Sequence, residues 1–143
     1  MRVVATRRLQ FAIGHRVHGH EGKCAHLHGH NFILLLTAER EHEGLDGIGR
    51  VLDFGVLKDR LGGWIERSWD HGFLLWQEDK EAIEAMTWVH GQKYFLLPYN
   101  PTAENVGRYL LEVVGPQVLA GTGVRLVRAV VHETENGIAE VEL

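Results

Sequence analysis

Two strand-like apolar segments, one on each side of a histidine- and glycine-rich segment, do most to constrain the fold of this chain. Residues 3–13 place apolar side chains mainly at alternate positions, and residues 32–38 are apolar at nearly every position. The first pattern predicts a strand with one buried face, and the second predicts a strand with both faces covered. If the two strands pair as a hairpin, the loop at residues 14–27 brings His15 back beside His28.

The middle of the chain predicts helices. Asp53 is a candidate N-cap for a helix whose apolar side chains share one face, although Gly62-Gly63 weakens that helix near its end. A shorter helix is expected over residues 78–89. Thr102 follows a break at residues 98–101 and is a candidate N-cap for another amphipathic helix.

The last segments predict a second hairpin. Residues 124–132 form a β-branched run, and residues 138–143 are expected to return antiparallel to it after the turn signal Asn136-Gly137. We therefore expect one α+β domain over residues 1–143, in the order β-β-α-α-β-β, with two main helices on one face of a four-stranded antiparallel sheet. The exposed edges and apolar second face of such a sheet favour burial by a partner subunit, so we expect a homo-oligomer.

Composition and charge argue against several classes of partner. The net charge is −4 and the basic residues are scattered, which argues against binding of nucleic acid. No apolar stretch approaches the ~20 residues that span a bilayer, so no membrane partner is expected. The first residues lack the pattern of a signal peptide, and a single cysteine excludes an internal disulfide. Both observations favour a cytoplasmic protein.

Six of the ten histidines lie between residues 15 and 30, and three of them are candidate metal ligands. His28 and His30 are two residues apart at the start of a strand, so both rings point to one face. His15 lies at the end of the preceding strand and would join them through the hairpin. Three imidazoles with one open coordination position are typical of a catalytic zinc site, so we predict Zn²⁺ here. The histidines left to the loop are His18, His20 and His26.

Cys24 lies four residues before His28 and leaves two interpretations open. As a fourth ligand, the thiolate would close the coordination sphere and make the zinc site structural. As a base beside an open site, it would take part in catalysis, and the neighbouring Lys23 and a metal would favour the thiolate form. These two roles of Cys24 are equally compatible with the spacing.

Several motifs occur in a fixed order along nearly the whole chain. They are Phe11-x3-His15, Cys24-x3-His28-Gly29-His30-Asn31-Phe32, Val51-Leu52-Asp53-Phe54 with Leu57-Lys58, Asp70-His71, Pro101-Thr102-Ala103-Glu104-Asn105 and Val130-Val131-His132-Glu133-Thr134. This ordered set resembles the 6-pyruvoyl-tetrahydropterin synthase family, which includes bacterial 6-carboxy-tetrahydropterin synthase. The resemblance implies the tunnelling fold (T-fold), in which trimers form a barrel and two trimers commonly stack.

The resemblance also implies a role for each matching residue. Zinc would be held by His15, His28 and His30. The Cys24 thiol would be the general base, with Asp70 and His71 as its partners in proton transfer. The carboxylate of Glu133 would anchor the pterin ring. The remaining substrate-binding candidates, Thr102 and Glu104, would lie near that ring.

The activity implied by the resemblance is that of a zinc-dependent lyase acting on 7,8-dihydroneopterin triphosphate. We expect 6-carboxy-5,6,7,8-tetrahydropterin as the product, with release of acetaldehyde and triphosphate, on the route to queuosine and other deazapurines. One alternative is 6-pyruvoyl-tetrahydropterin formation by elimination of triphosphate. A second alternative is a non-catalytic zinc-binding T-fold protein. Residues 72–75 depart from the family pattern and residues 76–97 form a longer insert, which leaves the substrate detail open.

Overall fold

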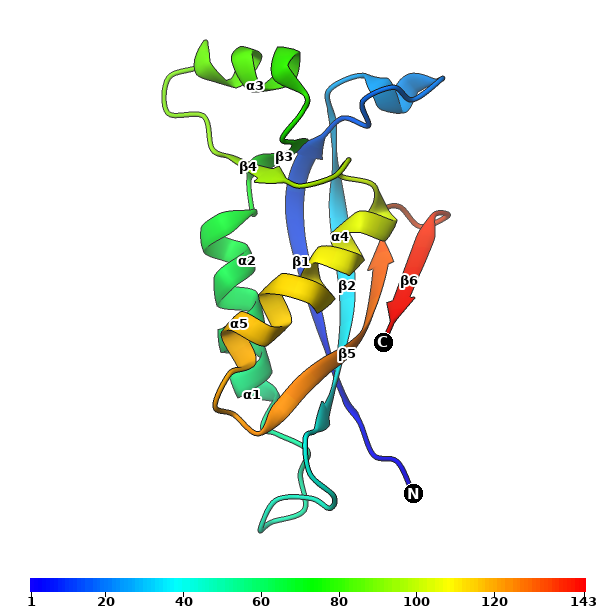
Figure 1. Cartoon of the computed structure of the whole chain (residues 1–143), viewed down its shortest axis with the longest axis vertical. Coiled ribbons are helices and arrows are strands. Elements are labelled where there is room, and N and C mark those ends of the chain that lie inside the picture. Colours follow the sequence, from blue (N-terminus) through cyan, green and yellow to red (C-terminus); the bar gives the residue numbers. More distant parts are fainter.

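A computed structural model of residues 1–143 shows one six-stranded sheet with helices packed against one of its faces (Figure 1). The strand order across the sheet is β4-β3-β1-β2-β5-β6. The strands are β1 (Ala5–His15), β2 (His28–Arg40), β3 (Gly72–Trp76), β4 (Tyr94–Leu97), β5 (Val124–His132) and β6 (Ile138–Glu142).

Both expected helix starts are confirmed. The Asp53 side chain accepts a hydrogen bond from the Gly55 N–H, and the Thr102 side chain accepts one from the Asn105 N–H. Each cap opens a long helical stretch with one π-helical turn in its middle, at Lys58–Gly62 and at Leu110–Val114. The shorter expected helix is also present. The α-helices are α1 (Phe54–Leu57), α2 (Gly63–Ser68), α3 (Lys80–Thr87), α4 (Ala103–Tyr109) and α5 (Gly115–Leu119).

The two expected hairpins are present, and the first has the expected register. β1 and β2 pair antiparallel with His15 opposite His28. β5 and β6 also pair antiparallel, but residues 133–137 form a five-residue connection rather than a two-residue turn at Asn136-Gly137. In this connection the Thr134 hydroxyl accepts hydrogen bonds from the N–H groups of Asn136 and Gly137, which replaces the expected turn chemistry.

The expectation of a four-stranded antiparallel sheet is wrong in the number of strands and in part of their direction. β3 pairs parallel with β1, and β4 pairs parallel with β3, so the sheet has six strands and is mixed. β3 spans five residues and β4 spans four. Apolar runs this short occur in helices and loops as well as in strands, so their pairing depends on the edge that β1 offers them.

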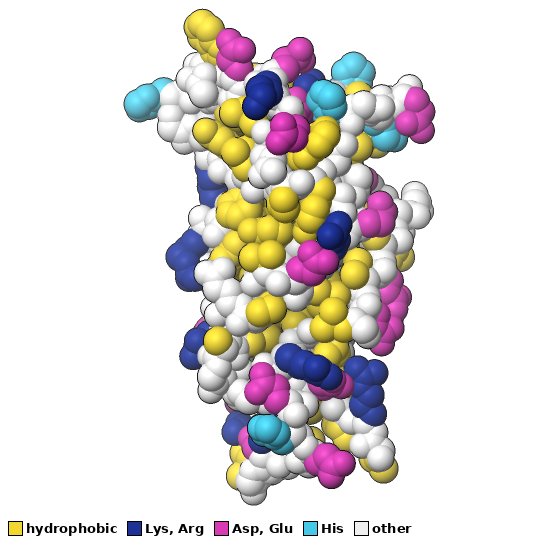
Figure 2. Space-filling model, viewed as in Figure 1, with side chains coloured by type: hydrophobic (Ala, Val, Ile, Leu, Met, Phe, Trp, Pro, Cys, Tyr) yellow, Lys and Arg dark blue, Asp and Glu magenta, His cyan; other side chains and the backbone are white.

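The core lies between the sheet and the long helices. Phe32, Leu34 and Leu36 of β2 point into it and are fully buried. Ile33 and Leu35 point to the opposite face and are only partly buried, so the expected cover of both faces is not met within one chain. On the helix side, Figure 2 shows exposed hydrophobic side chains along the middle of the molecule, with charged side chains around them. Each helix is too short or too polar to span a bilayer.

Candidate metal centre

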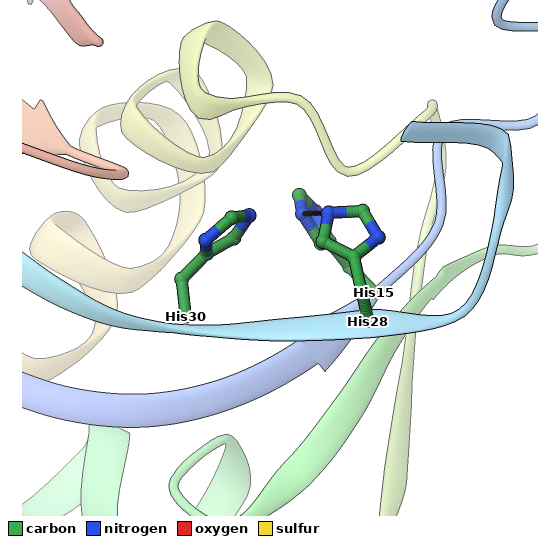
Figure 3. A group of neighbouring side chains, drawn as sticks. All are labelled: His15, His28 and His30. Carbon is green, nitrogen blue, oxygen red and sulfur yellow. Dashed lines mark hydrogen bonds between the residues drawn. The ribbon is translucent and has the colours of Figure 1, made fainter. Parts of the chain in front are cut away.

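Three histidine side chains from β1 and β2 converge at one end of the sheet (Figure 3). His15 lies opposite His28 in the hairpin, and Ile13 lies opposite His30. Because residues that face each other across a pair of strands share a face, all three rings lie on the helix-covered side. Their ligand atoms all lie within 4.8 Å of one another, so the three residues predicted as ligands form a group that could hold a metal ion.

Backbone carbonyl groups determine which nitrogen of His15 and His28 faces the centre of the group. His15 Nδ1–H donates to the Pro101 carbonyl oxygen, and His28 Nδ1–H donates to the His26 carbonyl oxygen, each at 2.7 Å. A neutral imidazole that donates from Nδ1 carries a lone pair on Nε2. The two Nε2 atoms therefore present lone pairs to each other at 3.1 Å. A cation between them would relieve this repulsion.

His30 and Glu133 complete the surroundings of the group. His30 Nε2 is buried and has no hydrogen-bond partner. A buried unpartnered nitrogen is costly unless a ligand satisfies it. The Glu133 carboxylate lies 3.6 Å from His30 Nε2 and 4.0 Å from His15 Nε2. It follows β5 directly, so the carboxylate predicted to hold a pterin ring lies beside the three imidazoles.

Burial favours the neutral, metal-binding form of His15 and His30. His15 is 1% exposed, and its burial lowers its pKa from 6.5 to about 4. The hydrogen bond to Pro101 opposes this shift, whereas repulsion from His28 and His30 adds to it. Burial also lowers the pKa of His30, against the opposite effect of the Glu133 carboxylate. Metal ligation requires unprotonated nitrogen, so the burial favours a metal site.

The donor set fits a transition metal. Two tetrahedral ligands at about 2.0–2.1 Å from zinc are about 3.3 Å apart, close to the separation of the His15 and His28 Nε2 atoms. Hydrogen bonds from the outer ring nitrogens to carbonyl groups are the usual support of metal-bound histidines. Three imidazoles leave at least one coordination position for water or a substrate oxygen.

Cys24 lies in the loop between β1 and β2, outside the set of converging ligand atoms. It belongs to a single 3-10 turn, Lys23–Ala25, and is partly buried. Its carbonyl oxygen accepts a hydrogen bond from the Val17 N–H at 2.8 Å. The other loop histidines, His18, His20 and His26, are also outside the set.

Asp70 and His71 form a hydrogen-bonded pair on the β3 side of β1. His71 Nδ1 lies 2.8 Å from an Asp70 carboxylate oxygen, and the other oxygen accepts the Ala12 N–H at 3.0 Å. Burial would raise the pKa of Asp70, but these two hydrogen bonds and the attraction of His71 and Lys93 together outweigh it, and the pKa is lowered. The His71 side chain is 80% exposed and has a left-handed backbone, with φ of 61°. The pair makes no hydrogen bond to the three converging histidines in this chain.

Thr102 and Glu104 lie at the start of α4. Thr102 is the N-cap, and Glu104 is exposed in the first turn. The neighbouring Pro101 supplies the carbonyl group that orients His15. Sequence reasoning missed this contact and that of the His26 carbonyl group, because a backbone acceptor leaves no residue-specific signal in the sequence.

A hollow of about 520 Å³ adjoins Glu133 and His30 at this end of the sheet. This volume lies within the usual range for small-molecule sites. Its lining residues are Gln10, His30, Asn31, Ile33, His132, Glu133, Thr134 and Glu135.

Comparison with known proteins gives a consistent picture. A family model described as 6-pyruvoyl tetrahydropterin synthase matches residues 5–143. A relative from Rickettsia bellii named 6-carboxy-5,6,7,8-tetrahydropterin synthase is 37% identical over 97% of this chain and 99% of its own length. A protein of the same name from Haemophilus influenzae is 28% identical over 73% of this chain and 77% of its own length.

Solved structures share the fold. An uncharacterized protein from Wolinella succinogenes superposes with a TM-score of 0.79 at 20% identity, covering 99% of this chain and 98% of that one. The 6-pyruvoyl tetrahydropterin synthase of Caenorhabditis elegans superposes with a TM-score of 0.67 at 22% identity, covering 100% of this chain and 99% of that one.

Proposed function

Because this chain belongs to the 6-pyruvoyl tetrahydropterin synthase family, we propose that it is a zinc-dependent lyase acting on 7,8-dihydroneopterin triphosphate. The proposed product is 6-carboxy-5,6,7,8-tetrahydropterin, with acetaldehyde and triphosphate released. The relatives at 34–37% identity are named 6-carboxy-5,6,7,8-tetrahydropterin synthase, which favours this product over a 6-pyruvoyl product. The observation that carries the proposal is the convergence of three imidazole side chains beside the Glu133 carboxylate.

His15, His28 and His30 would hold the zinc ion. Bound there, zinc would act as a Lewis acid toward the hydroxyl groups of the substrate side chain. The carbonyl groups of Pro101 and His26 keep two of the rings oriented with Nε2 inward. This arrangement is preorganised, because the rings need no rotation to accept the metal.

Glu133 would determine how the pterin lies. The ring presents an amino group and a ring N–H, and a carboxylate can accept hydrogen bonds from both at once. Glu133 stands at the end of β5, where the strand limits its movement, and next to the hollow lined by Gln10 and Thr134. A ring held there would direct its side chain toward the three histidines. Thr102 and Glu104 are proposed to contribute from the start of α4.

Proton transfer is assigned to Cys24 and to the Asp70–His71 pair. A thiolate at Cys24 would accept a proton from the substrate side chain. Asp70 holds one nitrogen of the His71 ring, which leaves the other nitrogen to exchange a proton with substrate. The loop position of Cys24, outside the converging nitrogen atoms, favours the role of base over that of fourth ligand.

The test is to incubate the zinc-loaded protein with 7,8-dihydroneopterin triphosphate and to identify every product by mass spectrometry. We expect 6-carboxy-5,6,7,8-tetrahydropterin, acetaldehyde and triphosphate in equal amounts. A 6-pyruvoyl product with triphosphate and no acetaldehyde would support the alternative that the family description names. An unchanged pterin would contradict both enzymatic proposals.

The non-catalytic alternative is tested with Cys24→Ala. The enzyme proposal expects this variant to keep its zinc and its fold while turnover falls by at least about 100-fold, the scale of general acid–base catalysis. Loss of zinc together with the folded state would instead identify Cys24 as a ligand of a structural site, because structural zinc supplies folding free energy.

A further inference from the structure

The loop between β1 and β2, which carries Cys24, is held to the rest of the structure by the side chain of Asn100. The His18 N–H donates to Asn100 Oδ1, and Asn100 Nδ2 donates to the His18 carbonyl oxygen, each at 2.9 Å. Two opposed hydrogen bonds to one residue determine its orientation as well as its position. Asn100 is the only side chain outside the loop that hydrogen-bonds to the backbone of residues 17–25.

Asn100 is itself fixed in the same region that orients a metal ligand. Its carbonyl oxygen accepts hydrogen bonds from the Thr102 N–H and from Asn105 Nδ2, each at 2.9 Å. The next carbonyl group, that of Pro101, accepts the His15 Nδ1–H at 2.7 Å. One dipeptide therefore contacts both the loop and the candidate metal centre.

The connection from His18 to Cys24 is short. Val17, the neighbour of His18, donates its N–H to the Cys24 carbonyl oxygen at 2.8 Å. The His20 N–H donates to the Val17 carbonyl oxygen at 3.1 Å, which closes the first turn of the loop. A shift of His18 would therefore move Cys24 with it.

We propose that Asn100 is a positioning residue that holds the Cys24 loop at a defined place relative to His15. Its side-chain amide binds the loop, and its backbone is continuous with the carbonyl group that orients the metal ligand. This role rests on the proposed function in one respect, that Cys24 reacts with a substrate bound at the metal centre. The positioning itself is a property of the fold and is measurable without substrate.

A separate contact holds the start of the loop and gives the insert at residues 76–97 a structural role. Arg16 pairs with Asp79 through two hydrogen bonds of 2.6 and 2.7 Å, and the Asp79 side chain is 1% exposed. This fork-like contact fixes residue 16, which lies between His15 and Val17. It acts through the Arg16 side chain, whereas Asn100 binds the loop backbone itself at His18, so Asn100 is the more direct anchor of the loop that carries the thiol.

The test compares Asn100→Ala and Asn100→Asp with a matched control. Alanine removes both hydrogen bonds to His18, whereas aspartate keeps the acceptor, loses the donor and places a carboxylate near the His18 carbonyl oxygen. The control is Arg50→Ala, which removes side-chain hydrogen bonds to Asp46 and Asp53 in the loop at the far end of β2. Cys24 is the only cysteine, so the rate of alkylation by iodoacetamide reports on this one thiol.

We expect every variant to retain zinc. Both Asn100 variants should be alkylated several-fold faster than the wild-type protein, because the loop is released. Their kcat should fall at least about tenfold, since small misplacements of a reacting group are costly, while KM stays within about twofold. Arg50→Ala should match the wild-type protein in each measurement.

Two outcomes would overturn the proposal. Alkylation and kcat equal to those of the wild-type protein would show that the loop needs no such anchor. Loss of zinc from Asn100→Asp would show that Asn100 supports the metal centre instead. If Asn100→Ala does not fold, the test is the rate of amide hydrogen exchange at Val17 and His18 in Asn100→Asp. Exchange rates equal to those of the wild-type protein would contradict the proposal. A wild-type protein that leaves the pterin unchanged refutes only the proposed function, since alkylation and exchange need no substrate.

Discussion

His15 combines burial, a fixed tautomer and contact with two other imidazoles. Its Nδ1–H donates to Pro101, and its Nε2 faces His28. Burial lowers its pKa to about 4 from 6.5. Unfolding exposes the ring, so between these two pH values the unfolded chain binds a proton that the folded chain does not. The contribution of His15 to stability is present above pH 6.5 and is lost as the pH falls toward 4.

This difference in proton binding predicts an acid-sensitive metal-free protein. Between pH 7 and pH 4, the His15 titration should remove about 3 kcal/mol from the free energy of unfolding. Urea denaturation of the chelator-treated protein measures this loss. In the His15→Gln variant, the glutamine amide can still donate to Pro101 but does not titrate. Between pH 7 and pH 4 the free energy of unfolding of this variant should therefore fall by about 3 kcal/mol less than that of the wild-type protein. If the free energies of unfolding of the two proteins changed equally with pH, the prediction would be refuted.

The helical stretch that ends in α5 lies close to β5 at Gly115. A Cβ atom at this position would lie 2.8 Å from Leu126 Cβ and 3.1 Å from the Leu110 carbonyl oxygen. Neither neighbour is the end of a flexible side chain, so relief requires a shift of the helix against the sheet. The close approach of the two elements therefore depends on glycine at residue 115.

We expect Gly115→Ala to lower the free energy of unfolding by about 1–3 kcal/mol, the usual cost of overpacking. This loss should exceed the gain of up to about 1 kcal/mol that alanine brings to a helix. Thermal and urea denaturation measure the change. Gly47→Ala is the control, because a Cβ atom there meets no heavy atom within 4 Å. A Gly115→Ala protein at least as stable as the control would contradict the tight packing.

At the scale of the whole molecule, the sheet is incomplete in a single chain. β3 pairs with β1 only at Ile13–His15, which leaves most of that side of β1 without a strand partner. β6 is the opposite edge of the sheet, and the face that carries Ile33 and Leu35 has no covering layer. Unpaired edges and a partly apolar open face favour association with further copies.

We therefore predict a homo-oligomer, and the family resemblance implies that it is built from trimers, as a trimer or a dimer of trimers. Light scattering coupled to size-exclusion chromatography should give a mass that is a multiple of three chains, each of 16.2 kDa. The mass should not depend on zinc, because the three histidines belong neither to the unpaired part of β1 nor to the face that carries Ile33 and Leu35. A monomer at all concentrations, or a dimer, would contradict this prediction.

The sequence alone determined the two hairpins, the capped helices and the three candidate ligands. Alternating side chains define the two faces of a strand, and Asp53 and Thr102 have the chemistry of N-caps. The hairpin of β1 and β2 places His15 beside His28 in any fold that contains this hairpin. These features depend on short-range geometry. The resemblance to a known family, which the comparisons confirm, added Glu133 and the Asp70–His71 pair to the candidate site residues.

The tertiary structure alone decided the parallel pairing of β3 and β4, the tautomers of the histidines and the anchoring of the Cys24 loop. Pro101 and His15 are 86 residues apart, and Asn100 and His18 are 82 residues apart. The partners in these contacts are backbone carbonyl and N–H groups, which every residue type carries. Only the folded chain determines which of them meets a given side chain, so these contacts leave no pattern in the sequence.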